Sequence, residues 1–203
     1  MDKENESFKF VDLPVKLDEI IDPSENYLEQ RWKVIDLLSS TEITLDDYLP
    51  YWFVNSEKKY TWNLVVQSDK FNIIMLVWNP KRESPIHDHP CNGCWVWVLE
   101  NEIRETVYDK SEEGTLETTA DNVYWEGGVT WMHDVKGFHK IGNPGEEIAV
   151  TMHVYSPPFE FANVINEDMT KTQCIICYDS EGGVPVTTNH TSQVIKSITD
   201  GVK

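Results

Sequence analysis

The sequence has few basic residues and no long apolar run. It contains 17 Lys and Arg against 35 Asp and Glu, which gives a formal net charge of -18. Such a charge repels phosphate backbones and anionic lipid surfaces, so we expect neither a nucleic acid nor a membrane as partner. No stretch approaches the roughly 18 consecutive apolar residues of a membrane-spanning helix. Because the first residues are polar and acidic, we also expect no secretory leader.

Cysteine is scarce as well. Four cysteines among 203 residues are too few for a disulfide scaffold and are typical of a reducing compartment, which favours a cytoplasmic protein. With 40% hydrophobic residues, a chain of this length buries enough apolar surface to fold without a metal or a disulfide. A metal site in this chain would therefore serve a function rather than hold the fold together.

The hydrophobic pattern changes its period once along the chain. In the N-terminal part, apolar residues recur at helical steps, as in the series Leu28, Trp32, Ile35 and Leu38. Thr44 with Asp47 three residues later is typical of a helix start. Beyond about residue 58, short β-branched and aromatic runs alternate with turn signals; they span 64–66, 71–78, 94–99, 103–108 and 148–155.

This pattern predicts a mainly β protein, an antiparallel sandwich or barrel with a small N-terminal helical subdomain on its outside. We predict one structural domain in three parts. Residues 1–57 form the helical segment packed on the barrel, residues 58–181 form the barrel with its metal site, and residues 182–203 form a surface tail. We expect the protein to be a monomer.

Three histidines are candidate metal ligands. His87 and His89 are two residues apart, so in an extended segment both imidazoles point to the same face. Such a pair alone is weak support for a metal site, because exposed histidine pairs on loops are common. His139 lies on another predicted strand, and a barrel brings such strands face to face. The three imidazoles can therefore converge on one ion.

These histidines lie within a set of longer motifs. The motifs are Tyr60-Thr61-Trp62-Asn63-Leu64-Val65, Ile86-His87-Asp88-His89 with Cys94, Glu105-Thr106, Gly137-Phe138-His139 with Asn143, and His153-Val154-Tyr155-Ser156-Pro157-Pro158-Phe159. From about Tyr48 to Val186, the sequence resembles the cysteine dioxygenase family, which are thiol dioxygenases of the cupin superfamily.

The resemblance implies a cupin-type antiparallel β-barrel, or jelly roll, with one non-haem Fe(II) per chain and no organic cofactor. It makes His87, His89 and His139 the iron ligands. A common cupin pattern has a glutamate where Cys94 stands, so three neutral imidazoles leave the iron its full charge, which a substrate thiolate can compensate. The implied reaction adds both atoms of O2 to the sulfur of cysteine. Its product is cysteine sulfinic acid, which belongs to cysteine catabolism and taurine biosynthesis.

The resemblance also assigns roles to four further residues. Cys94 and Tyr155 match a pair that is joined by a thioether in the animal enzymes. Thr151, His153 and Tyr155 are spaced two apart on one strand face, and they match a hydrogen-bonded Ser-His-Tyr series with Thr in place of Ser. Without the resemblance, Cys94 is equally well explained as a small buried hydrophobe. His153 and Tyr155 are then satisfied core residues.

One position departs from the family pattern. Trp62 stands where cysteine-specific enzymes have the arginine that is assigned to the substrate carboxylate. An indole offers one neutral N–H instead of a charged fork, so oxidation of a small thiol other than cysteine is an alternative function. Tyr60 and Trp62 are the candidate substrate-binding residues, and Lys59 and Arg82 are candidates for a replacement cation.

Two C-x2-C pairs favour an alternative from another class, a zinc-binding interaction protein. The pairs are Cys91 with Cys94 and Cys174 with Cys177. They lie far apart in the sequence, and in a strand the second pair would point to opposite faces. A cupin that only binds a ligand or stores sugar is a third alternative, which leaves Cys94 and Tyr155 without a purpose.

Overall fold

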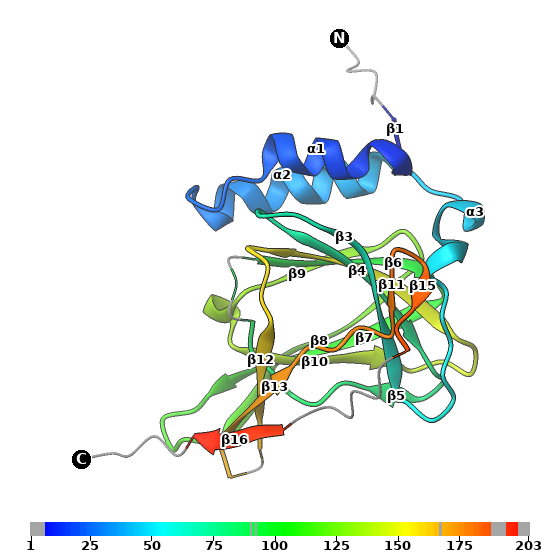
Figure 1. Cartoon of the computed structure of the whole chain (residues 1–203). Coiled ribbons are helices and arrows are strands. Elements are labelled where there is room, and N and C mark those ends of the chain that lie inside the picture. Colours follow the sequence, from blue (N-terminus) through cyan, green and yellow to red (C-terminus); the bar gives the residue numbers. More distant parts are fainter. Residues whose placement is uncertain (1–6, 90, 92, 167, 188–193, 199–203) are drawn as a thin grey trace.

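The change of period along the sequence corresponds to a change from helices to strands in the computed structural model (Figure 1), which describes residues 7–89, 91, 93–166, 168–187 and 194–198. The helices are α1 (Leu13–Ile20), α2 (Tyr27–Ser40) and α3 (Leu45–Tyr48). The strands are β1 (Phe8–Lys9), β2 (Thr41–Glu42), β3 (Tyr60–Gln67), β4 (Asn72–Trp78), β5 (Arg82–Glu83), β6 (Gly93–Glu100), β7 (Glu102–Lys110), β8 (Leu116–Trp125), β9 (Val129–Met132), β10 (Phe138–Asn143), β11 (Ala149–Ser156), β12 (Phe161–Ile165), β13 (Lys171–Ile175), β14 (Ser180–Glu181), β15 (Val184–Pro185) and β16 (Val194–Ile198). The predicted mainly β class with a small N-terminal helical part is confirmed.

Helix α3 begins where the sequence predicts, but α2 buries a different face. Asp47 accepts the backbone N–H of Thr44 at 2.8 Å, which confirms the predicted cap of α3. In the predicted periodic series of α2, Leu28 and Trp32 are exposed. The buried face instead carries Gln30, Val34, Leu37 and Leu38. A polar residue can occupy this face because the amide of Gln30 donates to the carbonyl of Asp22 at 3.0 Å.

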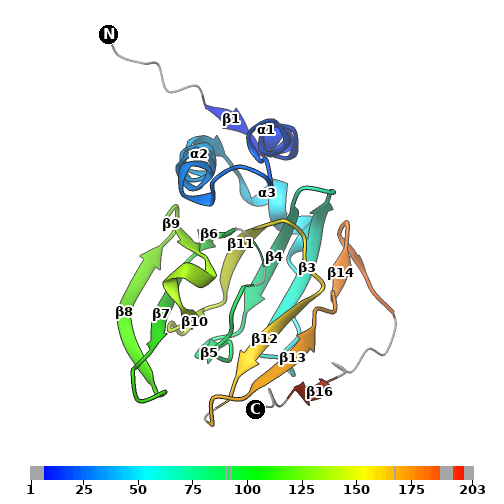
Figure 2. The ribbon, with the colours of Figure 1, turned by 90° about the vertical axis from the view of Figure 1, so that its left-hand side faces the viewer.

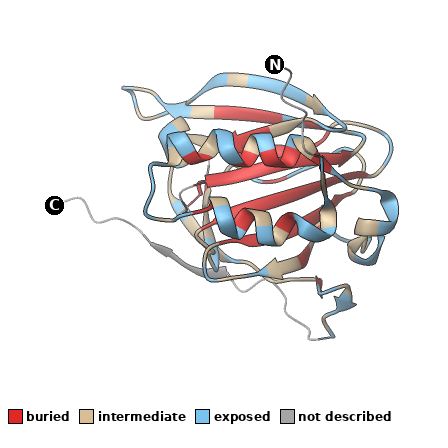
Figure 3. Ribbon diagram, turned by 90° about the horizontal axis from the view of Figure 1, so that it is seen from above, coloured by how far each residue is buried: buried red, intermediate tan, exposed pale blue. Residues whose placement is uncertain are grey.

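The main sheet has seven strands in the order β15-β14-β3-β4-β11-β6-β9. Its central strands β4 and β11 are buried at every position. An antiparallel sheet more often leaves one face to solvent. Here α1 and α2 cover one face and the second sheet lies opposite the other (Figures 1 and 2). Seen from above, the two helices lie across the buried strands (Figure 3).

The second sheet is completed by the segment that carries two of the candidate ligands. Strands β5-β10-β7-β8 form one part and β12-β13-β16 another. His87 exchanges both backbone hydrogen bonds with His139 of β10, at 2.9 and 3.1 Å. On its other side, Asp88 donates its backbone N–H to Asn163 of β12 at 3.1 Å. Residues 86–88 therefore act as a short strand between β10 and β12.

Two positions have the left-handed backbone that their turns require. Asn101, between β6 and β7, has a φ of 58°, so it takes the place of a turn glycine. Gly137 has a φ of 97°, and a Cβ there would lie 2.1 Å from the carbonyl oxygen of Tyr108. Glycine is thus needed at the start of β10, two residues before His139.

The three-part division of the chain remains a prediction. Of the predicted surface tail 182–203, residues 188–193 and 199–203 lie outside the described residues. Within that tail, β15 pairs with β14 and β16 pairs with β13. In the described part of the chain, no helix is both long and apolar enough to cross a bilayer.

The packing of the helices on the main sheet can be tested at Leu17, which is 0% exposed in α1. We expect Leu17→Ala to lower the free energy of unfolding by about 2–5 kcal/mol, because it leaves a cavity among apolar neighbours. Val15 on the same helix is 60% exposed, so Val15→Ala should change the free energy of unfolding by no more than about 0.5 kcal/mol. Urea denaturation measures both. Equal effects of the two substitutions would contradict this packing.

Candidate metal centre

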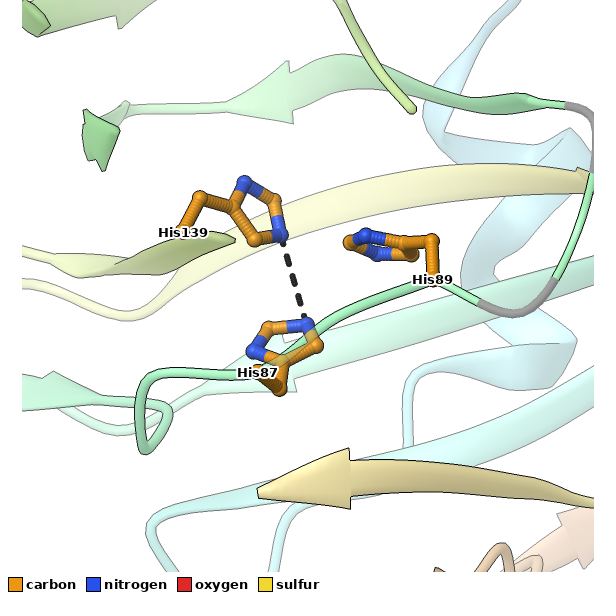
Figure 4. Close-up of side chains that lie close together, drawn as sticks. All are labelled: His87, His89 and His139. Carbon is orange, nitrogen blue, oxygen red and sulfur yellow. Dashed lines mark hydrogen bonds between the residues drawn. The ribbon is translucent and has the colours of Figure 1, made fainter. Parts of the chain in front are cut away.

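The structure brings the three predicted ligands together. One ligand atom from each of His87, His89 and His139 lies within 4.8 Å of the others. His87 and His139 are directly opposite each other on neighbouring strands, so their side chains share a face. His89 follows two residues after His87 and joins them from the end of the segment (Figure 4). Of the described residues, these form the one cluster of three or more potential ligand side chains.

Their hydrogen bonds leave lone pairs that face each other. The Nδ1 of His87 donates to the carbonyl of Pro85 at 3.0 Å, and the Nδ1 of His139 donates to Glu105 at 2.7 Å. Each ring therefore has its unprotonated Nε2 free, and these two atoms are 3.3 Å apart. The buried Nδ1 of His89 has no hydrogen-bond partner among the residues that the structure describes. Two facing lone pairs and an unpartnered ring nitrogen fit a metal cation.

Burial keeps these rings neutral. It lowers the pKa of His87, and it lowers the pKa values of His89 and His139 well below the ordinary value. For His89 and His139 the neighbouring imidazoles add to this effect. Protons are therefore poor competitors for the lone pairs, and three neutral nitrogen donors with no carboxylate among them form the candidate site.

Glu105 is a site residue to which the sequence analysis assigned no role. It is fully buried on β7 and accepts from His139 through one oxygen and from the hydroxyl of Thr130 at 2.8 Å through the other. Burial lowers the pKa of His139 well below its ordinary value, so the contact is a hydrogen bond from a neutral imidazole rather than an ion pair. A signal was present in the sequence, because Ile103, Glu105 and Val107 alternate at inward positions.

A hydrogen-bonded chain runs along β11 beside the histidines. The indole N–H of Trp78 donates to the hydroxyl of Thr151 at 2.8 Å. That hydroxyl lies 2.8 Å from Nε2 of His153, and the Tyr155 hydroxyl lies 3.1 Å from Nδ1. Burial lowers the pKa of His153 to about 3, so the ring carries one N–H. With Thr151 donating to Nε2, His153 donates to Tyr155, so this contact does not use the phenol proton.

Cys94 and Tyr155 lie opposite each other on β6 and β11. Both are buried, and a hydrogen bond links the phenol and the thiol. Burial raises the pKa values of both groups well above their ordinary values. Neither group is therefore ionised at neutral pH in the absence of a metal.

Two adjoining cavities give access to this cluster. An inner cavity of about 20 Å³ and an outer one of about 350 Å³ share the side chains of Tyr60, Trp62, His87, His89 and Tyr155. The predicted substrate-binding pair therefore lies at the junction of the two cavities. Of the two candidate cations, Lys59 lines the outer cavity and Arg82 lines neither.

The four cysteines do not assemble. Cys91 and Cys94 are buried, whereas Cys174 and Cys177 are half-buried and line the outer cavity. In the described chain, no three of the four thiols lie at ligand distance from one another. The alternative based on two C-x2-C pairs therefore has no shared site to support it.

Comparisons with known proteins agree on one family. The profile of the family described as Cysteine dioxygenase type I matches residues 4–168. Cysteine dioxygenase type 1 of Danio rerio is 28% identical over 66% of this chain and 69% of its own length. The Rattus norvegicus protein of the same name is 30% identical over 64% of this chain and 69% of its own length.

A solved structure from Klebsiella pneumoniae, described as an uncharacterized conserved protein with a double-stranded beta-helix domain, is 17% identical to this chain. The two structures match over 57% of this chain and 84% of the Klebsiella pneumoniae chain, with a TM-score of 0.43. The family assignment depends on the profile, whose match extends over both the helical part and the strands that carry the three histidines. The chain belongs to the cysteine dioxygenase type I family.

Proposed function

We propose that this protein is an Fe(II)-dependent dioxygenase that adds both atoms of O2 to the sulfur of cysteine, or of a related small thiol, to give a sulfinic acid. Membership of the family supports the reaction. The observation that supports it most strongly is the cluster of three neutral imidazoles without a carboxylate. One ion per chain and no organic cofactor are required.

His87, His89 and His139 would hold the iron through ring nitrogens. A bound ferrous ion would supply the redox chemistry with O2 and the positive charge that attracts a thiolate. Because the ligands are neutral, the charge of a substrate thiolate is not opposed by a protein carboxylate at the site. Glu105 and the carbonyl of Pro85 fix the rings of His139 and His87 in the tautomer that leaves Nε2 free.

Tyr155 acts as the proton donor at the rim of the site in this proposal. Trp78, Thr151 and His153 orient its phenol through their hydrogen bonds, and the phenol proton, which the contact with His153 does not use, can then be directed to a polar atom of substrate or oxygen. A Cys94–Tyr155 thioether would replace the hydrogen bond between these groups with a C–S bond. Its formation removes two hydrogen atoms, and O2 accepts the two electrons.

The substrate's polar end meets Tyr60 and Trp62 at the junction of the cavities. Neither side chain supplies the charged fork that an arginine gives a carboxylate. Cysteine is therefore a substrate with a high KM, and a thiol without an α-carboxylate suits this wall equally well.

The metal site is tested by replacing its ligands. We expect His87→Ala, His89→Ala or His139→Ala to abolish iron binding and leave the protein folded, because a core of this size does not depend on the ion. His133→Ala, which removes a histidine outside the cluster, should keep the iron. Metal analysis, circular dichroism and O2 uptake provide the readouts. A native protein that carries about one zinc per chain and shows no iron-dependent O2 uptake would contradict the proposal.

The cross-link is tested by peptide mass mapping after turnover with thiol and O2. The peptides of Cys94 and Tyr155 should be joined with the loss of two hydrogen atoms. Cys94→Ser should abolish the joined species, and Cys91→Ser, which changes the other buried cysteine of this segment, should retain it. Quantitative alkylation of Cys94 in denatured protein after turnover would rule the thioether out.

Trp62→Arg tests the substrate's polar end. A charge-assisted fork contributes about 1.5–3 kcal/mol, so we expect kcat/KM for cysteine to rise roughly ten- to a hundredfold. Activity with cysteamine, which lacks the carboxylate, should not rise. Trp62→Gln, which adds a polar but uncharged group, controls for the loss of the ring. If the native protein already prefers cysteine strongly and Trp62→Arg has no effect, another residue binds the carboxylate.

A further inference from the structure

The inner cavity offers no lysine or arginine to a carboxylate. Among the described residues that line it, Lys and Arg are absent, and three of its four histidines are the candidate metal ligands. A substrate carboxylate held close to the three imidazoles would therefore be removed from water without a protein cation beside it, which is strongly unfavourable.

Two lysines, Lys58 and Lys59, line the outer cavity. Lys58 is paired with Asp179 at 2.5 Å, and Asp179 also accepts the backbone N–H of Trp62 at 3.0 Å. Lys59 is exposed and lines the same cavity. In the described part of the chain, no carboxylate lies within ion-pair distance of Lys59. Asp179 thus neutralises one lysine and leaves the charge of the other available.

Much of the remaining wall of the outer cavity is apolar. It includes Phe159, Ala162 and Val164 of β12, and the consecutive residues Ile175 and Ile176. The cavity of about 350 Å³ has room for about twelve heavy atoms at the ~30 Å³ that one water occupies in the liquid. Cysteine has seven. The cavity therefore exceeds what the established substrate of the named relatives would fill.

We propose that the outer cavity is a subsite for the tail of a longer thiol, in which an apolar spacer ends in an anionic group that pairs with Lys59. This inference rests on the proposed thiol oxidation and specifies its substrate class. The sulfur lies at the three imidazoles, the spacer lies against β12 and residues 175–176, and the anion remains beside the exposed Lys59. Such a substrate satisfies both the apolar wall and the absence of lysine and arginine from the inner cavity.

The charge requirement is tested with 6-mercaptohexanoate and 6-mercaptohexanol, which share a spacer and differ in the end group. We expect kcat/KM to be at least tenfold higher for the acid, and we expect Lys59→Gln to bring the ratio of the two values close to one. Lys110→Gln, which removes an equal charge from an exposed position on β7, should leave the ratio unchanged. Equal rates for the two thiols with native protein would overturn the inference.

The spacer requirement is tested by filling the cavity. Ala162 lies opposite Cys174 on the cavity face of the β12–β13 pair, so Ala162→Phe should lower kcat/KM for 6-mercaptohexanoate at least tenfold relative to cysteamine. An unchanged ratio would overturn the inference.

A binding measurement separates this inference from the proposed reaction. Hexanoate and 1-hexanol carry the two end groups without a thiol, and ligand-observed NMR or calorimetry reports their binding to the full chain. Tighter binding of hexanoate that is lost in Lys59→Gln supports the subsite even if no thiol is oxidised. Oxidation of cysteine or cysteamine together with equal binding of hexanoate and 1-hexanol leaves the reaction standing and rejects the subsite.

Discussion

The pair of backbone hydrogen bonds between His87 and His139 is the contact on which the site depends. It makes residues 86–88 a strand of the second sheet. Because directly opposed residues share a face, the same pairing points both imidazoles into the barrel, and the alternation along the strand carries His89 to that face as well. Ligand geometry is therefore a consequence of sheet pairing. Gly137 contributes to it by allowing β10 to start against Tyr108.

The chemistry of the site follows from its burial. The main sheet is covered on both faces, so β11 carries Thr151, His153 and Tyr155 in surroundings that exclude water. Burial there disfavours every charged form: it lowers the pKa values of the histidines and raises those of Tyr155 and Cys94. The neutral rings are then suitable ligands, and the neutral phenol retains its proton. The same dry interior makes an unpaired substrate carboxylate costly.

How much of the fold and of the candidate site could be predicted from the sequence depends on how far apart in the sequence the contacting residues are. Local patterns sufficed for the mainly β class, the cap at Thr44 and the shared face of Thr151, His153 and Tyr155. The face that α2 buries was missed, because the tolerance of Gln30 there depends on the carbonyl of Asp22. Contacts between distant segments, such as Trp78 with Thr151 and Lys58 with Asp179, have no local signal.

The metal segment also connects the ligands to the wall of the outer cavity. Asp88 lies between His87 and His89 and points to the opposite face of the strand. There its carboxylate accepts the backbone N–H of Asn163 and the ammonium group of Lys171, each at 3.0 Å. These contacts fasten β12 and β13 to the segment that holds two imidazoles. Because β12 supplies Ala162 and Val164 to the cavity, residues 87–89 connect the wall that meets a substrate to two of the three metal ligands.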